Sequence, residues 1–94
     1  MKNELKEFGK IVSLEGLEKA IEKVSKDLGY KVRRDKDSNI RIRKGTIFPS
    51  GMTLIPRNYE NGIAGITYLT GSGYGNISDK DRNEYLQKLI ENLN

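Results

Sequence analysis

Four cationic side chains alternate with apolar residues in the segment KVRRDKDSNIRIRKG, residues 31 to 45, and they are suited to binding an anion. They are Lys31, Arg33, Arg41 and Arg43. Guanidinium groups hold phosphate or carboxylate oxygens in pairs, and ammonium groups act as point charges. The alternation has the two-residue period of a β-strand, which places all four side chains on one face. We therefore predict an anion-binding face, with the backbone of DNA or RNA as its candidate ligand.

A hairpin with its turn centred on Asp37 gives these cations a specific register. In that register Arg33 lies opposite Arg41. Lys31 lies opposite Arg43 on the same side, and the apolar residues between them face the other side. Like charges directly opposite each other destabilise an antiparallel pair of strands. Folding alone does not favour this arrangement, and an anionic partner would relieve the repulsion.

The residues allow three interpretations of this face. It is a solvated face whose charges keep an edge strand from aggregating, a nucleic-acid-binding surface, or a surface for an acidic protein. Arg57 is a further candidate for nucleic-acid binding, because it belongs to the same basic part of the chain. Tyr74 is another candidate, since an exposed aromatic ring flanked by glycines can stack on a base. The same ring can instead fold back onto the core.

The charge of the chain is unevenly distributed. The net charge is +4, but residues 1–29 carry six cations and six anions, and residues 58–94 carry three cations and five anions. Residues 30–57 carry eight cations and only two anions. The whole basic excess therefore lies in the middle third, around the predicted hairpin.

The residue types of the sequence give little support for a catalytic or metal-binding site. The chain has no histidine and no cysteine, which excludes Ser-His and Cys-His nucleophiles and thiolate or imidazole metal sites. Asp79, Asp81 and Glu84 lie at the start of a predicted helix, where carboxylates usually interact with the helix dipole. The segment DKDSN resembles the start of a calcium loop, but the sixth and twelfth positions are Ile40 and Thr46 in place of Gly and Glu. We predict a non-enzymatic binding module without metal or cofactor.

The glycine-rich segment GSGYGN, residues 71–76, joins a predicted strand to a predicted helix. Backbone N–H groups at such a junction can hold a phosphate. The Lys-Ser/Thr pair of a P-loop and the G-x-G-x-x-G spacing are both absent. A plain flexible turn is the simpler interpretation.

The hydrophobic pattern predicts the elements that must position these residues. Apolar residues at steps of three and four predict a helix over 14–28, with Ser13 as its N-cap and Gly29 as its left-handed C-cap. Two-residue alternation predicts strands over 30–34 and 40–44. Further strands are predicted over 8–12, over 52–55 with an end near Pro56, and over IAGITYLT (63–70), which is apolar on both faces and so central. Ser78 begins a last helix whose buried face is Tyr85, Leu86, Leu89, Ile90 and Leu93.

These elements give the order (β)-α-β-β-β-β-α. We predict an α+β two-layer fold, with a mainly antiparallel sheet of three to five strands and both helices on one face. The 94 residues correspond to one domain, 1–94. No apolar run approaches the roughly 20 residues that span a bilayer, so a cytoplasmic protein without membrane contact is expected. The thin core and the apolar strand 63–70 also favour a homodimer.

Overall fold

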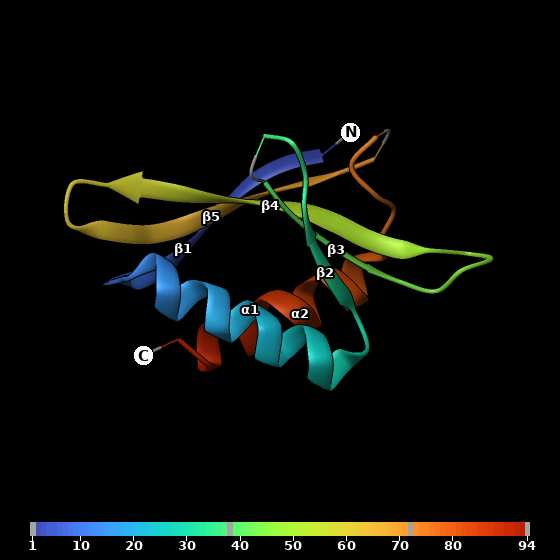
Figure 1. Cartoon of the computed structure of the whole chain (residues 1–94), viewed down its shortest axis with the longest axis horizontal. Coiled ribbons are helices and arrows are strands. Elements are labelled where there is room, and N and C mark those ends of the chain that lie inside the picture. The colour runs from blue at the N-terminus through green and yellow to red at the C-terminus, as the bar shows by residue number, and fades with distance from the viewer. Residues whose placement is uncertain (1, 38, 72, 94) are drawn as a thin grey trace.

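The computed structural model describes residues 2–37, 39–71 and 73–93, and its elements follow the predicted order. They are β1 (Lys2–Val12), α1 (Leu14–Leu28), β2 (Lys31–Arg34), β3 (Ile40–Lys44), β4 (Ser50–Tyr59), β5 (Gly62–Thr70) and α2 (Asp79–Glu91). The five strands form one antiparallel sheet in the order β1-β5-β4-β3-β2. Both helices lie on the same face of this sheet (Figure 1). The predicted α+β fold is confirmed.

The caps of the helices are those that the sequence predicts. The Ser13 side chain accepts a hydrogen bond from the N–H of Gly16 at 2.9 Å, and Gly29 ends α1 with φ +83°. At the start of α2, Ser78 accepts a hydrogen bond from the N–H of Asp81 at 3.1 Å. Each cap satisfies backbone groups that a helix end leaves unpaired, so both helix boundaries are fixed locally.

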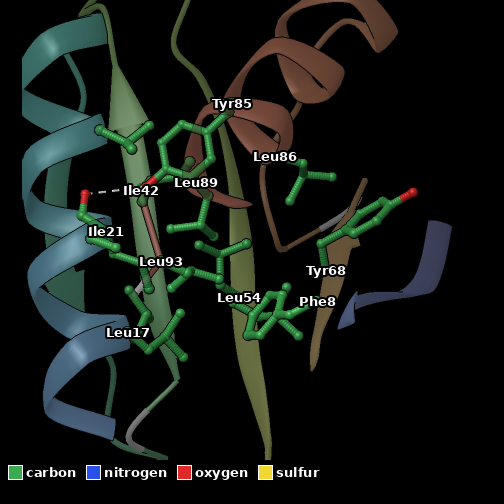
Figure 2. Close-up of a cluster of buried hydrophobic side chains, with 14 of the residues drawn as sticks. Phe8, Leu17, Ile21, Ile42, Leu54, Tyr68, Tyr85, Leu86, Leu89 and Leu93 are labelled. Atoms are coloured by element: carbon green, nitrogen blue, oxygen red, sulfur yellow. Dashed lines mark hydrogen bonds between the residues drawn. The ribbon is translucent and has the colours of Figure 1, made fainter. Parts of the chain in front are cut away.

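The hydrophobic core lies between the sheet and the two helices (Figure 2). Tyr85 of α2 is fully buried at its centre. Its ring meets the ring of Tyr30 edge-on, with centroids 5.4 Å apart, and its hydroxyl lies 2.7 Å from the Ser25 hydroxyl of α1. The hydroxyl is thus partnered inside an apolar layer, as burial of a polar group requires. Tyr85 links both helices to the start of β2.

Burial of the Tyr85 hydroxyl predicts a loss of stability in alkali. Burial raises the pKa of Tyr85 to about 12, from an ordinary value of 10.0. Between these two values the unfolded chain loses a proton that the folded chain keeps, so stability falls as pH rises. We expect the free energy of unfolding to decrease by roughly 1 kcal/mol per pH unit in this window, measured by urea titration. The decrease should be smaller in Tyr85→Phe and unchanged in Tyr59→Phe, whose ring is exposed.

Two strand predictions are wrong in their bounds. β1 begins at residue 2, whereas the predicted strand begins at residue 8. The sequence pattern does not reveal the first residues of β1 because most of them are polar and give no apolar alternation. Among the described strands, β1 is an edge strand that pairs with β5 alone. Its register shifts between Glu7 and Val12, near Gly9 at φ +77°. A bulge of this kind interrupts the two-residue period that is typical of a strand.

The second correction concerns β4, which was predicted to end near Pro56 but continues to Tyr59. Pro56 lies opposite Ile66 within the β4–β5 ladder. The β3–β4 ladder reaches no further than the pair Ile40 and Leu54. Beyond that pair β4 is bonded on one side only, and a proline is tolerated where the other side of a strand is open.

The β2–β3 hairpin was predicted closely. β2 begins at Lys31, one residue later than predicted, and β3 covers the predicted range. Its turn is held by the Asp35 carboxylate, which accepts hydrogen bonds from the N–H groups of Asp37 and Asn39 at 2.9 and 3.0 Å. Ser38 of this turn and Ser72 of the glycine segment lie outside the described residues. Within the described part of the chain, no helix has the length and apolar character needed to cross a bilayer.

Candidate functional site

The four cations of the hairpin have the predicted register. Lys31 pairs with Arg43, and Arg33 pairs with Arg41. In β3 these arginines alternate with Ile40 and Ile42, which are each 2% exposed and pack in the core. The cationic side chains therefore extend from the face of the sheet that the helices do not cover.

A groove of about 670 Å³ lies beside these residues. One wall is formed by strands β2 and β3 of the hairpin. The other is the glycine loop, of which Gly71 and residues 73–75 are described and line the groove. We call it the basic groove. Among the described residues that line it there is no aspartate or glutamate, and the charged ones are Lys31, Arg33, Arg41, Arg43 and Lys44.

The glycine loop is a closed turn and not an open phosphate cradle. The N–H of Gly71 donates to the carbonyl of Gly75 at 2.7 Å, and the N–H groups of Tyr74 and Gly75 donate back to the carbonyl of Gly71. These three donors are used within the loop and are not free for an anion. The interpretation of this segment as a plain turn is the one that its geometry supports.

Arg41 joins the glycine loop to the sheet. Its Nη2 donates to the carbonyl of Gly73, and its Nε lies 3.4 Å from the Thr53 hydroxyl. Thr53, which is 1% exposed, donates in turn to the carbonyl of Tyr74 at 3.0 Å. The strand pattern predicts Arg41 as one of four equivalent anion-binding residues, but much of its hydrogen-bonding capacity is used to position the loop.

The other three cations have a different environment. Lys31, Arg33 and Arg43 are exposed. Among the described residues, no ion pair involves any of them, whereas the neighbouring Arg34 points to the helix side and pairs with Glu18 at 2.7 Å. The groove thus presents three positive charges without a carboxylate partner in the described chain.

Of the two remaining predicted site residues, one lines the groove and the other does not. Tyr74 is partly buried and lines the groove. Arg57 is exposed on β4 opposite Gly65, and it is not part of the groove lining. Lys44 lines the groove but is not among the site residues predicted from the sequence, because its position in the strand pattern places it on the core side of β3. Its Nζ lies 4.7 Å from the centre of the Tyr30 ring, over which it is held.

The pKa of Tyr30 is raised chiefly by burial. The charge of Lys44 acts in the opposite direction and lowers the pKa. The Lys44 ammonium group lies over the Tyr30 ring as a cation–π partner. Lys44 adds positive potential to the rim of the groove without being a free ligand.

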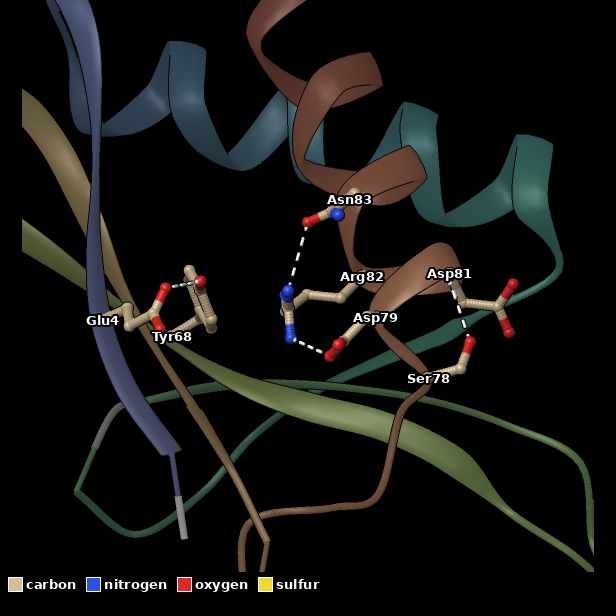
Figure 3. Close-up of polar contacts among 7 residues, drawn as sticks. All are labelled: Glu4, Tyr68, Ser78, Asp79, Asp81, Arg82 and Asn83. Atoms are coloured by element: carbon tan, nitrogen blue, oxygen red, sulfur yellow. Dashed lines mark hydrogen bonds and ion pairs between the residues drawn. The ribbon is translucent and has the colours of Figure 1, made fainter.

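A second polar cluster, between α2 and the β1–β5 edge, has a structural role (Figure 3). Arg82 is 7% exposed and pairs with Asp79 at 2.6 Å. Its guanidinium lies 5.5 Å from the centre of the Tyr68 ring, whose hydroxyl donates to Glu4. Burial and this hydrogen bond raise the pKa of Tyr68. The contacts hold α2 against the sheet.

The carboxylates at the start of α2 therefore do not converge on a reaction site. Asp79 is the partner of Arg82, and the backbone N–H of Asp81 is bound by the Ser78 cap. In the described ranges, no group of three or more acidic side chains is arranged to hold a metal ion. The basic groove is the better candidate for function.

Comparisons of this chain with models of protein families, with curated proteins and with solved structures give no match. The charge and shape of the groove are therefore the basis for its proposed function. Its lining offers guanidinium and ammonium groups, which recognise anions.

Proposed function

We propose that this protein binds the phosphate backbone of a nucleic acid in the basic groove. The observation that carries the proposal is the composition of the lining, whose described residues include five cations and no carboxylate. Three of the cations, Lys31, Arg33 and Arg43, have no ion-pair partner among the described residues. A polyanion with regularly spaced charges would neutralise them together, and such binding is largely independent of sequence.

The size of the groove supports a local segment of one strand as the ligand. Protein pockets of roughly 300–1,000 Å³ enclose small-molecule-sized ligands, and the groove lies within this range. A double helix is too wide to enter and would reach only the rim. The backbone of a single strand can place its phosphates between the hairpin and the glycine loop.

An acidic protein surface is the alternative ligand, and a homodimer is the alternative assembly. The dimer was inferred from the apolar character of β5 on both faces. That strand is central within the monomer, between β1 and β4. Leu69, on the face opposite the helices, is 8% exposed next to Thr53, which binds the glycine loop. Burial within the monomer therefore accounts for the apolar character of β5. The homodimer stays a prediction that light scattering checks.

The salt dependence of binding tests the proposal. Fluorescence anisotropy with a labelled single-stranded oligonucleotide should show an affinity that falls as salt concentration rises. Three phosphate contacts give a slope of log affinity against log salt of about −2 on a single strand. Unlabelled duplex and an acidic polypeptide, polyglutamate, serve as competitors.

A single strand should compete better than polyglutamate at the same concentration of charge. No binding to DNA or RNA at low salt would end the proposal. If polyglutamate competed as well as the single strand, the acidic-protein interpretation would replace it.

A further inference from the structure

Two neighbouring apolar side chains lie in solvent at the β3–β4 loop, residues 45–49. Ile47 is 82% exposed and Phe48 is 91% exposed. They are the most exposed large apolar residues in the described part of the chain, followed by Tyr59 at 56%. The other phenylalanine, Phe8, is 7% exposed in the core. Two adjacent large apolar groups in water suggest a contact that the isolated chain does not make.

The loop lies at the rim of the basic groove. Gly45, Thr46 and Pro49, which flank the apolar pair, all contribute to the groove lining. The loop extends beyond the end of the sheet (Figure 1). It is closed tightly, because a Cβ at Gly45 would lie only 3.1 Å from the carbonyl oxygen of Phe48, and Gly45 has φ +89°. Phe48 thus lies in the chain between Thr46 and Pro49, which both line the groove.

We propose that Phe48 stacks on an unpaired base of the strand whose phosphates lie in the groove, so that the protein prefers single-stranded to duplex nucleic acid. This inference rests on the proposed function. A base is bonded to the same sugar that carries the phosphate, and it must lie beside any groove that holds the backbone. Every base has a flat π-face, so such stacking tolerates all sequences. In a duplex those faces are covered by neighbouring bases and are not available to Phe48.

The shape of the surface favours a strand over a membrane. An anionic bilayer also attracts cations that adjoin an exposed apolar loop. Here Lys31, Arg33 and Arg43 line a concave groove, however, and a flat lipid surface does not enter a groove of about 670 Å³. A flexible strand can enter the groove and still reach Phe48 at its rim.

The experiment compares Phe48→Ala with Phe48→Tyr on three probes, which are oligothymidylate, the same sugar-phosphate chain without bases, and a duplex. Phe48→Ala should weaken binding to oligothymidylate roughly 5- to 150-fold, the effect of one lost aromatic–base stack. Phe48→Tyr keeps a ring and should bind like the wild type. The salt slope should not change, because no charge is removed. Binding to the baseless chain and to the duplex should be nearly unaffected.

Tyr59→Ala provides the matched control, since Tyr59 is an exposed aromatic residue at the end of β4 that lies away from the groove-lining residues Ser50 and Gly51. It should leave all three affinities unchanged. If Phe48→Ala bound oligothymidylate like the wild type, or lost the same factor on the baseless chain, the stacking inference would be wrong and the proposed function would stand. Absence of wild-type binding to every nucleic acid would overturn both. Binding to phosphatidylserine vesicles that Phe48→Ala abolishes, without preference for the single strand, would assign the loop to a membrane instead.

Discussion

Replacing Lys31, Arg33 and Arg43 together by glutamine is expected to lower the affinity for single-stranded nucleic acid on the order of 100-fold at about 0.1 M salt. Each phosphate contact on a single strand contributes about 0.7 to the salt slope, so three contacts are worth about two powers of ten at this concentration. The slope itself should fall to near zero. The measurement is a salt series of anisotropy titrations on wild type and variant.

The same triple variant should fold normally. Its three residues are exposed and make no ion pair among the described residues. Removing two facing like-charge pairs relieves repulsion across β2 and β3, so stability should be equal or slightly higher. Arg41 is left in place, because its loss would also release the glycine loop.

A matched control tests whether position or net charge matters. Lys19, Lys23 and Lys26 lie on the exposed side of α1, and glutamine at all three removes the same number of charges. This control should retain most of the affinity and of the salt slope. Equal losses in the two variants would show general attraction to a basic protein, and the groove would lose its assigned role.

Gly75→Ala should lower the free energy of unfolding by about 2–3 kcal/mol, because the glycine loop has no room for a side chain at this position. Gly75 has φ +118°, and a Cβ there would lie 2.6 Å from the carbonyl oxygen of Gly51. The neighbour is backbone in β4 and cannot rotate away. The loop must therefore shift, which strains its contacts with Arg41 and Thr53. Urea titration measures the loss.

Gly73→Ala is the control for this substitution. Gly73 also has positive φ, at +82°, but no atom lies within 4 Å of its Cβ position. It should cost only about 1 kcal/mol of backbone strain. Because the loop is one wall of the basic groove, Gly75→Ala should also weaken nucleic-acid binding more than Gly73→Ala does. Similar effects of the two variants on stability and binding would contradict the close packing of Gly75 on Gly51.

Local sequence signals were enough to place most of the elements. The three- and four-residue spacing of apolar residues, with Ser13 and Gly29 at its ends, fixed α1 to the residue. Strand alternation and the DKDSN turn fixed the hairpin register, since a shift by one residue would bury the cations. The strands whose bounds were wrong, β1 and β4, are those whose limits depend on partners distant in the sequence.

The candidate site could be predicted only in part, for the same reason. The sequence determined that the cations share one face of a hairpin and that no histidine or cysteine chemistry is available. It could not distinguish Arg41 from its neighbours, because the carbonyl that Arg41 binds belongs to Gly73, thirty-two residues away. It also grouped Arg57 with the other cations, since nearness in the chain is not nearness in space.

By itself, then, the sequence determined the periodic elements, their caps and the sign of the charge on the hairpin, because these follow from interactions between residues close together in the chain. Only the tertiary structure decided that the glycine loop folds over Thr53 and closes a groove against the hairpin. Only the tertiary structure left Phe48 in solvent at the rim of that groove while it buried Phe8 in the core. The physical reason is that burial and groove shape depend on which distant segments pack together. The composition of the chain and the spacing of its residues do not show directly which segments these are.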